Sequence, residues 1–205
     1  DMRERERGCF VEKMEETENG YCRVKLANGI SGFVPEVALR KRLDSDRFLW
    51  GKSEERFFVE QGIPEGWSEE KFRRKVVECA KGYLGCQYRW GGKAADGIDC
   101  SGVVFMVYLM NGVLIWRDAD IREGYPMKAI WREGEEMCLV EERAKAGDLL
   151  FWRGHVGMYL GDGRYLHCTG HERGFGCRVN SLRRGDEDFR KDLAEALKVV
   201  GSVFS

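Results

Sequence analysis

The sequence predicts an α+β protein in which a buried helix packs on an antiparallel sheet, with a smaller β module at the N-terminal end. The first observation is the segment DCSG at residues 99–102, followed by eight apolar residues, which is typical of a buried helix with a cysteine near its start. The second is a pair of apolar segments joined by the turn sequence GDG at residues 161–163, which predicts a hairpin. The third is a series of short alternating segments within residues 8–40, which predicts further strands.

The N-terminal segment, residues 1–43, has the pattern of a small β module. Its alternating stretches at residues 21–26 and 31–35 enclose the dipeptide Asn28-Gly29, which is a strong hairpin signal. A module of about 35 residues is marginal as an independent fold, so the alternative is a hairpin packed on the remainder of the chain. Residues 44–67 show no sustained period and are predicted to form a connector.

A helix is expected to begin at Ser68 and to end at Gly85. Serine is a preferred N-cap residue, and the acidic residues Glu69 and Glu70 complement the positive end of the helix dipole. One face of this helix is apolar and comprises Phe72, Val76, Ala80 and Tyr83.

Three later segments are assigned from their composition and spacing. Residues 116–143 are charge-rich and have no regular period, so we expect a loop that walls the cleft beside the buried helix. Asp148 follows Ala146-Gly147 at the start of a strand and is expected to be a structural turn residue. Residues 186–199 are predicted to form an amphipathic helix, because apolar side chains recur at every fourth position. These side chains are Phe189, Leu193 and Leu197.

The predicted hairpin carries two of the three histidines of the chain, His155 and His167. Side chains alternate along a strand, so the two imidazoles share a face only if the numbers of paired residues sum to an even value. A two-residue turn gives an odd sum, whereas a three-residue loop at 161–163 gives an even one. We therefore expect the three-residue loop, with Gly163 in the left-handed region. It pairs Gly157 with His167 and Leu160 with Arg164.

Cys100, His155 and His167 are the candidate catalytic residues. The positive end of a helix favours thiolate over thiol and is expected to lower the pKa of Cys100 from about 8.5. A cysteine nucleophile also needs an imidazole that takes and returns the thiol proton, and a third polar group that orients the imidazole. His155 and His167 can fill these two roles. The alternatives are an inert buried cysteine and structural histidines.

Four motifs give the chain a family resemblance: YRWGG at 88–92, GIDCSG at 97–102, AGDLLF at 146–151 and HVGMY at 155–159. Together they resemble the NlpC-type cysteine peptidases, which are papain-like hydrolases of bacterial cell-wall peptides. The resemblance implies a papain-like catalytic domain over residues 68–205. It also implies that the N-terminal module is a partial SH3-type domain, because such domains often precede this peptidase.

The resemblance assigns further site residues. It implies that Tyr88 lines the site and supports the oxyanion, and that Asp99 and Ser101 contribute to the substrate pocket. Asp99 has a second interpretation as the helix N-cap. The late segments at 178–182 and 189–195 resemble the branch that cleaves γ-D-glutamyl to diamino-acid bonds in short murein peptides. This chain departs from that branch at Ala119, where a serine that helps to hold the peptide is typical.

Three functions are therefore compared. The favoured one is a cysteine endopeptidase that hydrolyses murein peptides of the type L-Ala-γ-D-Glu-diamino acid through a thioacyl-enzyme. The second is a catalytically silent cell-wall-binding protein, against which the intact Cys100 and His155 argue. The third is an acyltransferase or amidase on the same scaffold, which a greasy channel in place of a polar peptide cleft would favour.

Composition excludes several partners. The chain has 34 basic and 35 acidic residues among its 205, so it carries no electrostatic footprint for nucleic acid. The apolar run at residues 103–110 is far shorter than the roughly 18 residues that span a bilayer. We expect neither a nucleic-acid partner nor a membrane span.

Eight cysteines raise the question of disulfides and metals. No C-x-x-C pair is present, and seven cysteines remain once Cys100 is reserved as the nucleophile, so complete pairing within the chain is impossible. We expect no metal ion, no cofactor, and free thiols in a reducing compartment such as the cytoplasm. Because the chain opens with an aspartate, removal of a signal peptide and a location in the cell envelope or outside the cell are left open.

Overall fold

The computed structural model describes residues 11–14, 19–25, 31–39, 66–94, 96–171 and 174–204. The chain divides into two units, residues 1–49 and 50–205. The expected connector at 44–67 lies outside the described residues apart from its last two positions, and so does the Asn28-Gly29 turn. The expected domain boundaries at residues 43 and 68 stay predictions.

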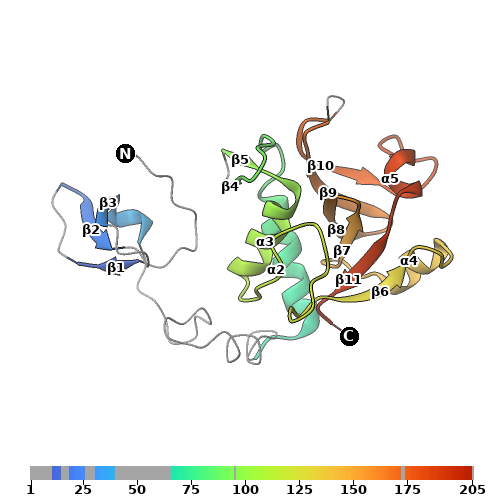
Figure 1. The fold of residues 1–205 in the computed structure, drawn as a ribbon, viewed down its shortest axis with the longest axis horizontal. Coiled ribbons are helices and arrows are strands. Elements are labelled where there is room, and N and C mark those ends of the chain that lie inside the picture. Colours follow the sequence, from blue (N-terminus) through green and yellow to red (C-terminus); the bar gives the residue numbers. More distant parts are fainter. Residues whose placement is uncertain are drawn as a thin grey trace. The chain divides into compact units, whose positions relative to one another are not determined.

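The N-terminal unit contains a three-stranded sheet in the order β1-β2-β3, followed by a short 3-10 turn (Figure 1). Strands β2 and β3 pair antiparallel, which confirms the predicted hairpin. The side chains of Cys22 and Val24 in β2 are buried. The resemblance of this unit to an SH3-type domain stays a prediction. The elements are β1 (Glu12–Lys13), β2 (Tyr21–Lys25), β3 (Ser31–Pro35) and η1 (Glu36–Ala38).

The second unit is built on a six-stranded sheet in the order β10-β9-β8-β7-β11-β6, in which every neighbouring pair is antiparallel (Figure 1). With the helices around it, this sheet confirms the predicted α+β class. The strands of the sheet are β6 (Lys128–Arg132), β7 (Leu149–Trp152), β8 (His155–Gly161), β9 (Arg164–Thr169), β10 (Gly176–Ser181) and β11 (Val199–Ser202). The other elements are β4 (Lys93–Ala94), β5 (Gly97–Ile98), α2 (Glu69–Lys81), α3 (Cys100–Met110), α4 (Cys138–Arg143) and α5 (Lys191–Glu195).

Helix α2 begins as predicted, because Ser68 is its N-cap and the side-chain oxygen of Ser68 accepts from the backbone N–H of Lys71 at 3.2 Å. It ends at Lys81, four residues before the expected Gly85. Gly85 has a φ of 83°, and its N–H donates to the carbonyl of Cys177 in β10 at 3.0 Å. Because of this hydrogen bond to β10, the helix ends earlier than the local sequence indicates.

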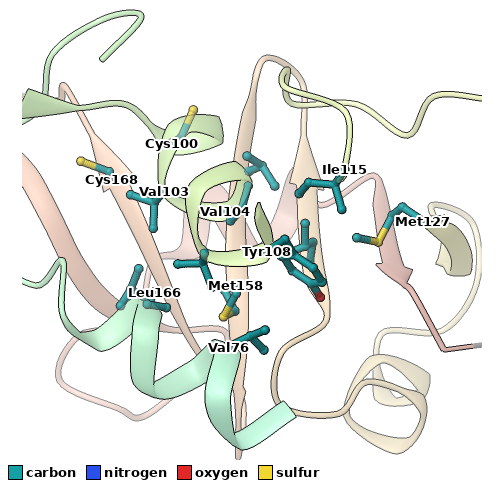
Figure 2. Packing of buried hydrophobic residues seen from close by; sticks show 14 of the residues in the cluster. Val76, Cys100, Val103, Val104, Tyr108, Ile115, Met127, Met158, Leu166 and Cys168 are labelled. Atoms are coloured by element: carbon teal, nitrogen blue, oxygen red, sulfur yellow. The ribbon is translucent and has the colours of Figure 1, made fainter. Parts of the chain in front are cut away.

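Helix α3 is buried on almost every side, which explains its continuous apolar sequence. It packs between α2 and one face of the sheet, where β8 and β9 supply Met158 and Leu166 (Figure 2). Burial of each large apolar side chain contributes about 1.5–3 kcal/mol, so this cluster holds the first turn of α3 firmly against the strands. Other members of the cluster include Val76, Val103, Val104, Val107 and Tyr108.

A second cluster lies on alternate residues of the same strands, where Leu150 and Trp152 from β7 pack with Tyr165 from β9. The indole N–H of Trp152 donates to the backbone carbonyl of Leu193 in α5 at 2.6 Å. None of the helices in the described part of the chain has the length and apolar character that a membrane crossing requires.

Two of the predicted segments differ from the structure. Residues 116–143 are not irregular throughout, since they contain β6 and α4, and β6 pairs with β11 at the edge of the sheet. Residues 186–199 contain only the short helix α5 before β11 begins at Val199. Backbone bonds from Arg190 to Ser181 and from Ser181 to Asp188 hold the first part of this segment against the end of β10. Pairing with distant strands therefore overrides the local helical pattern.

Candidate active site

The β8–β9 hairpin has the predicted parity but a different turn. Gly157 pairs with His167, and from this pair to the pair of Tyr159 with Tyr165 the residue numbers of the two partners sum to an even value. The turn itself has two residues, Asp162 and Gly163, with φ values of 52° and 74°. A bulge between Tyr159 and Gly161 supplies the extra residue that restores the even sum.

The expected pairing of Leu160 with Arg164 is therefore wrong, because Gly161 pairs with Arg164 instead. Gly161 has a φ of 95°, a conformation that a glycine adopts without the strain that a side chain would add. The bulge, and not a three-residue loop, puts the two imidazoles on one face.

The two imidazoles are in direct contact. Nε2 of His155 lies 2.7 Å from Nδ1 of His167, whose side chain is buried. Gly157 lies opposite His167, and a Cβ at that position would stand 2.9 Å from the Leu166 carbonyl oxygen and 3.2 Å from the His167 Cβ. The glycine thus leaves room for the close approach of the two strands beside the histidine pair.

Both histidines are held neutral near pH 7. Burial, together with the neighbouring His167 and Arg190, lowers the pKa of His155 to about 3. Burial also lowers the pKa of His167 to about 4, against a hydrogen bond that His167 donates to Asn180 and that favours the charged form. A neutral imidazole has one bare nitrogen, which is what a general base requires.

Cys100 is the first residue of α3, and it is only 8% exposed (Figure 2). The backbone N–H of Val156, the residue after His155, favours the thiolate form of Cys100. Burial nevertheless raises the pKa of the Cys100 thiol above its usual value, and the nearby Asp99 carboxylate adds to this effect. The expectation of a lowered pKa is therefore wrong for the site without substrate, because loss of water outweighs the helix end.

Asp99 caps α3, which confirms the second interpretation of this residue. Its carboxylate accepts from the N–H of Gly102 at 2.6 Å and from the N–H of Gly91 at 2.8 Å. It also forms an ion pair with Arg117 at 3.1 Å. Arg117 donates in addition to the Ser101 hydroxyl at 2.5 Å, so one guanidinium joins both residues that flank the cysteine.

Arg117 was not identified from the sequence as a site residue. It lies in the segment that was expected to wall the cleft, and an arginine in a charge-rich segment carries no distinguishing signal. Its side chain is 25% exposed, and its terminal nitrogens donate to Ser101, Asp99 and the Gly92 carbonyl.

Tyr88 lies near the same end of α3, where it forms an isolated bridge with Ile98. Burial raises the pKa of its hydroxyl, and negative charge on Cys100 and Asp99 acts in the same direction. Its ring packs edge-on against Phe175 with centroids 6.1 Å apart. The phenol is therefore protonated and able to donate a hydrogen bond near the cysteine.

Asn180 in β10 is a second residue that sequence reasoning missed. Its Oδ1 lies 3.0 Å from Nε2 of His167, and its Nδ2 donates to the backbone carbonyl of Asp188 at 2.8 Å. Its side chain is buried. The only sequence signal was its place in the segment 178–182 that resembles one branch of the family, and that resemblance named no role for it.

None of the seven cysteines that the structure describes, Cys100 among them, forms a disulfide bond. Cys168 lies on β9 directly opposite Cys177 on β10, and its thiol donates to the Ile98 carbonyl at 3.1 Å. Within the described ranges, no three His, Cys, Asp or Glu side chains are grouped so that they can hold a metal ion. The site thus combines a buried thiol at the start of α3, a neutral imidazole pair on the β8–β9 hairpin, the carboxylate that caps α3, an arginine and a phenol.

Comparison with known proteins gives this arrangement a context. Residues 85–185 match the model of the NlpC/P60 family. Dipeptidyl-peptidase 6 of Lysinibacillus sphaericus is 44% identical over 140 residues, which are 67% of this chain and 47% of that protein. Gamma-D-glutamyl-L-lysine dipeptidyl-peptidase of Bacillus subtilis is 36% identical over 119 residues, which are 54% of this chain and 37% of that protein. The chain spans less than half the length of each of these relatives.

A solved structure of an NlpC/P60 family protein from Bacillus cereus has the same fold. It superposes with a TM-score of 0.56 and 21% identity, over 93% of this chain and 52% of that chain. This likeness concerns the fold, and it agrees with the arrangement of α3 against the antiparallel sheet.

Proposed function

Because residues 85–185 are a domain of the NlpC/P60 family, we propose that this chain is a cysteine peptidase of bacterial cell-wall peptides. The observation that carries the proposal is the placement of Cys100 at the first turn of α3, which packs against β8, where the backbone N–H of Val156, the residue after His155, favours the thiolate. The contact of His155 with His167 at 2.7 Å supports the assignment of an oriented base.

Cys100 is the nucleophile in this proposal, and His155 is the general base. As the sulfur attacks the scissile carbonyl carbon, Nδ1 of His155 takes the thiol proton, because its Nε2 is already engaged with His167. The imidazolium then returns the proton to the leaving amine as the C–N bond breaks, and a thioacyl-enzyme remains. Water, deprotonated by the same nitrogen, releases the acid and restores the thiol.

His167 orients His155 by accepting a hydrogen bond from its Nε2–H, and this bond stabilises the positive charge that develops on the His155 ring. Loss of the base in His155→Ala removes a contribution that is typically about 10² to 10⁴ in rate. His167→Asn keeps a polar partner for His155, so we expect it to cost less. Tyr88, whose phenol is protonated near Cys100, is assigned to donate to the oxyanion of the tetrahedral intermediate.

The proposed substrate is a peptide with a γ-D-glutamyl to diamino-acid bond. One relative is named a gamma-D-glutamyl-L-lysine dipeptidyl-peptidase, and the late segments at 178–182 and 189–195 resemble that branch. A γ-linked D-glutamate keeps a free α-carboxylate near its scissile carbonyl, and the partly exposed side chain of Arg117 carries a guanidinium that is suited to pair with it. Asp99 and Ser101, which Arg117 already contacts, complete this polar wall.

The N-terminal ammonium of such a peptide could pair with Asp99, but the Asp99 carboxylate is already engaged. Asp99 already accepts two backbone N–H bonds and pairs with Arg117. An ammonium would share this carboxylate with the guanidinium, so its contribution to binding is smaller than that of an unshared ion pair.

The test is digestion of the synthetic tripeptide L-Ala-γ-D-Glu-L-Lys, its diaminopimelate counterpart and purified muropeptides, with the products identified by mass. We expect release of L-Ala-D-Glu and the free diamino acid, and no release by Cys100→Ala. Binding of wall material without cleavage would instead indicate the silent binding protein. Transfer of the acyl group to an added amine in preference to water would indicate an acyltransferase.

A further inference from the structure

A chain of three hydrogen bonds runs inward from the proposed base. Nε2 of His155 meets Nδ1 of His167 at 2.7 Å, and Nε2 of His167 meets Oδ1 of Asn180 at 3.0 Å. This series of hydrogen bonds ends where Nδ2 of Asn180 donates to the backbone carbonyl of Asp188 at 2.8 Å. The last two side chains are at most 3% exposed, so bulk water has little access to this end of the chain.

The series of hydrogen bonds is fixed at its inner end by the backbone carbonyl of Asp188, which can only accept a hydrogen bond. It forces the Asn180 amide to point its NH₂ group toward Asp188 and its oxygen toward His167, since the reverse orientation would set two acceptors against each other. Because that oxygen also only accepts, Nε2 of His167 must carry a proton.

The same reasoning passes through His167 to His155. A neutral imidazole has a single N–H, so a proton on Nε2 leaves Nδ1 of His167 as an acceptor. That acceptor requires a proton on Nε2 of His155, which leaves Nδ1 of His155 with its lone pair. Burial lowers the pKa of His155 to about 3 and that of His167 to about 4, which keeps both rings neutral and the argument applicable near pH 7.

We propose that Asn180 is a positioning residue that, anchored by the Asp188 carbonyl, sets the tautomer of His167 and through it the tautomer of His155. Its effect is to keep the lone pair of His155 on Nδ1, the nitrogen assigned to take the Cys100 proton. The inference rests on the proposed function for its kinetic consequence, whereas the tautomers themselves do not depend on it.

The backbone register explains how Asn180 reaches this position. In β10 it lies two residues from Arg178, which pairs with His167, so Asn180 and His167 share a face of the sheet on a diagonal. Its own pairing partner is Tyr165. Asp188 lies in the segment that returns beside β10, where its carbonyl also accepts from the N–H of Ser181.

Substitution of Asn180 by leucine keeps the approximate volume and removes both polar contacts. The tautomer of His167 with its proton on Nδ1 is then no longer disfavoured, and in that form it donates to His155 and moves the His155 proton to Nδ1. We expect Asn180→Leu to lower kcat by about ten- to a hundredfold with little change in KM, in line with the loss of one buried hydrogen-bonded partner.

Nitrogen NMR of the ¹⁵N-histidine-labelled full chain tests the tautomers directly, because only three histidines are present and His171 is exposed and outside the chain of bonds. We expect His155 and His167 each to be protonated at Nε2 in the wild-type protein, and His167 to shift toward Nδ1–H in Asn180→Leu. A proton on Nδ1 of His155 in the wild type, or identical tautomers in both proteins, overturns the proposal even if the peptidase activity is confirmed.

Two further variants separate positioning from stability. Asn180→Asp retains an acceptor facing His167, so it should keep the Nε2–H tautomers and raise the pKa of the pair, visible as a shift of the acid limb of the pH profile. Ser181→Ala removes the neighbouring buried hydroxyl, which donates to Asp186 at 2.6 Å, and leaves the chain of bonds untouched. We expect Ser181→Ala to lower the free energy of unfolding by about as much as Asn180→Leu does, without changing the histidine tautomers or kcat.

The kinetic arm is a double-mutant cycle with His167→Asn. An asparagine has no tautomer to set, so Asn180→Leu should cost less than about threefold in that background. An equal loss in both backgrounds would mean that Asn180 supports only the structure. If no substrate is cleaved by the wild-type chain, the proposed function fails while the NMR result still decides the tautomers.

Discussion

At the scale of single residues, the thiol of Cys100 is subject to opposing influences. Three backbone N–H groups, of Val156, Ser101 and Cys100 itself, favour the thiolate, whereas burial and the Asp99 carboxylate favour the thiol. Burial is the largest influence, so the pKa of Cys100 is raised. With His155 neutral, the free site holds an uncharged thiol and an uncharged imidazole, and the proton moves only when substrate reacts.

Alkylation tests this resting state. At pH 7 we expect iodoacetamide to modify Cys100 more slowly than the exposed Cys138, and the rate at Cys100 to rise as the pH passes above 9. Mass spectrometry of tryptic peptides over a pH series measures both rates in one sample. Complete modification of Cys100 before Cys138 at pH 6 would contradict the prediction and indicate a preformed thiolate–imidazolium pair.

The buried histidines also make stability depend on pH. Their pKa values in the folded chain, about 3 and about 4, lie below the usual value of 6.5, so the unfolded chain binds more protons between these limits. Stability is therefore full above pH 6.5 and is lost as the pH falls toward 4, by up to about 1.4 kcal/mol per pH unit for each histidine.

Urea unfolding at a series of pH values measures this slope. The double variant His155→Gln/His167→Gln should have a flatter profile between pH 6.5 and 4, because neither glutamine titrates. Equal slopes in the variant and the wild type would show that other groups carry the acid dependence.

At the scale of the secondary-structure elements, the β8–β9 hairpin sets the distance between the imidazoles. Its two-residue turn would put them on opposite faces, and the bulge after Tyr159 corrects the register by one residue. Gly157 then admits His167 directly opposite. The two-residue turn and the bulge each shift the strand register by one residue, and together they leave the two imidazoles on the same face of the sheet.

Gly157→Ala should disturb this pairing. Its methyl group would stand 2.9 Å from the Leu166 carbonyl oxygen, and backbone cannot move away as a flexible side chain can. We expect destabilisation of about 1–3 kcal/mol and a loss of kcat from the altered histidine contact. Met158→Leu, a volume-conserving change at the next position of β8, is the control and should leave kcat near the wild-type value. Unchanged kcat in Gly157→Ala would show that the strand separation tolerates a side chain.

At the scale of the whole catalytic unit, one buried ion pair joins three distant segments. Arg73 of α2 donates to Asp148, just before β7, at 2.9 Å and to the Ser202 hydroxyl at the end of β11 at 3.3 Å. The side chain of Asp148 is 1% exposed. The network therefore holds α2 against the sheet from the side remote from the histidines.

Removal of the Asp148 charge leaves the buried guanidinium of Arg73 with the exposed Glu69 as its remaining ion-pair partner. Asp148→Asn should lower the free energy of unfolding by about 3–5 kcal/mol, whereas Glu141→Gln, which weakens the exposed pair with Arg183, should cost less than about 1 kcal/mol. Denaturant unfolding compares the two. Activity per folded molecule should be retained in both variants, and a smaller loss in Asp148→Asn than in Glu141→Gln would refute the assigned importance of the buried pair.

The sequence by itself determined the parts of this protein that depend on neighbouring residues. The Ser68 cap, the start of α3 at Asp99-Cys100 and the pairing of Gly157 with His167 follow from cap chemistry, apolar runs and strand parity. Each of these signals depends on residues that are close together in the sequence, so it can be recognised from the sequence alone. The α+β class follows from the same signals.

The tertiary structure decided what depends on segments far apart in the chain. Strand β6 and the short α5 arise because sheet pairing overrides local patterns, and the end of α2 follows from its contact with β10. The partners of Asp99 and His167, Arg117 and Asn180, lie 18 and 13 residues away in sequence, with no local signal for either. The direction of the Cys100 pKa shift was decided there too, because desolvation depends on everything that packs around the thiol, whereas the helix end is a local feature.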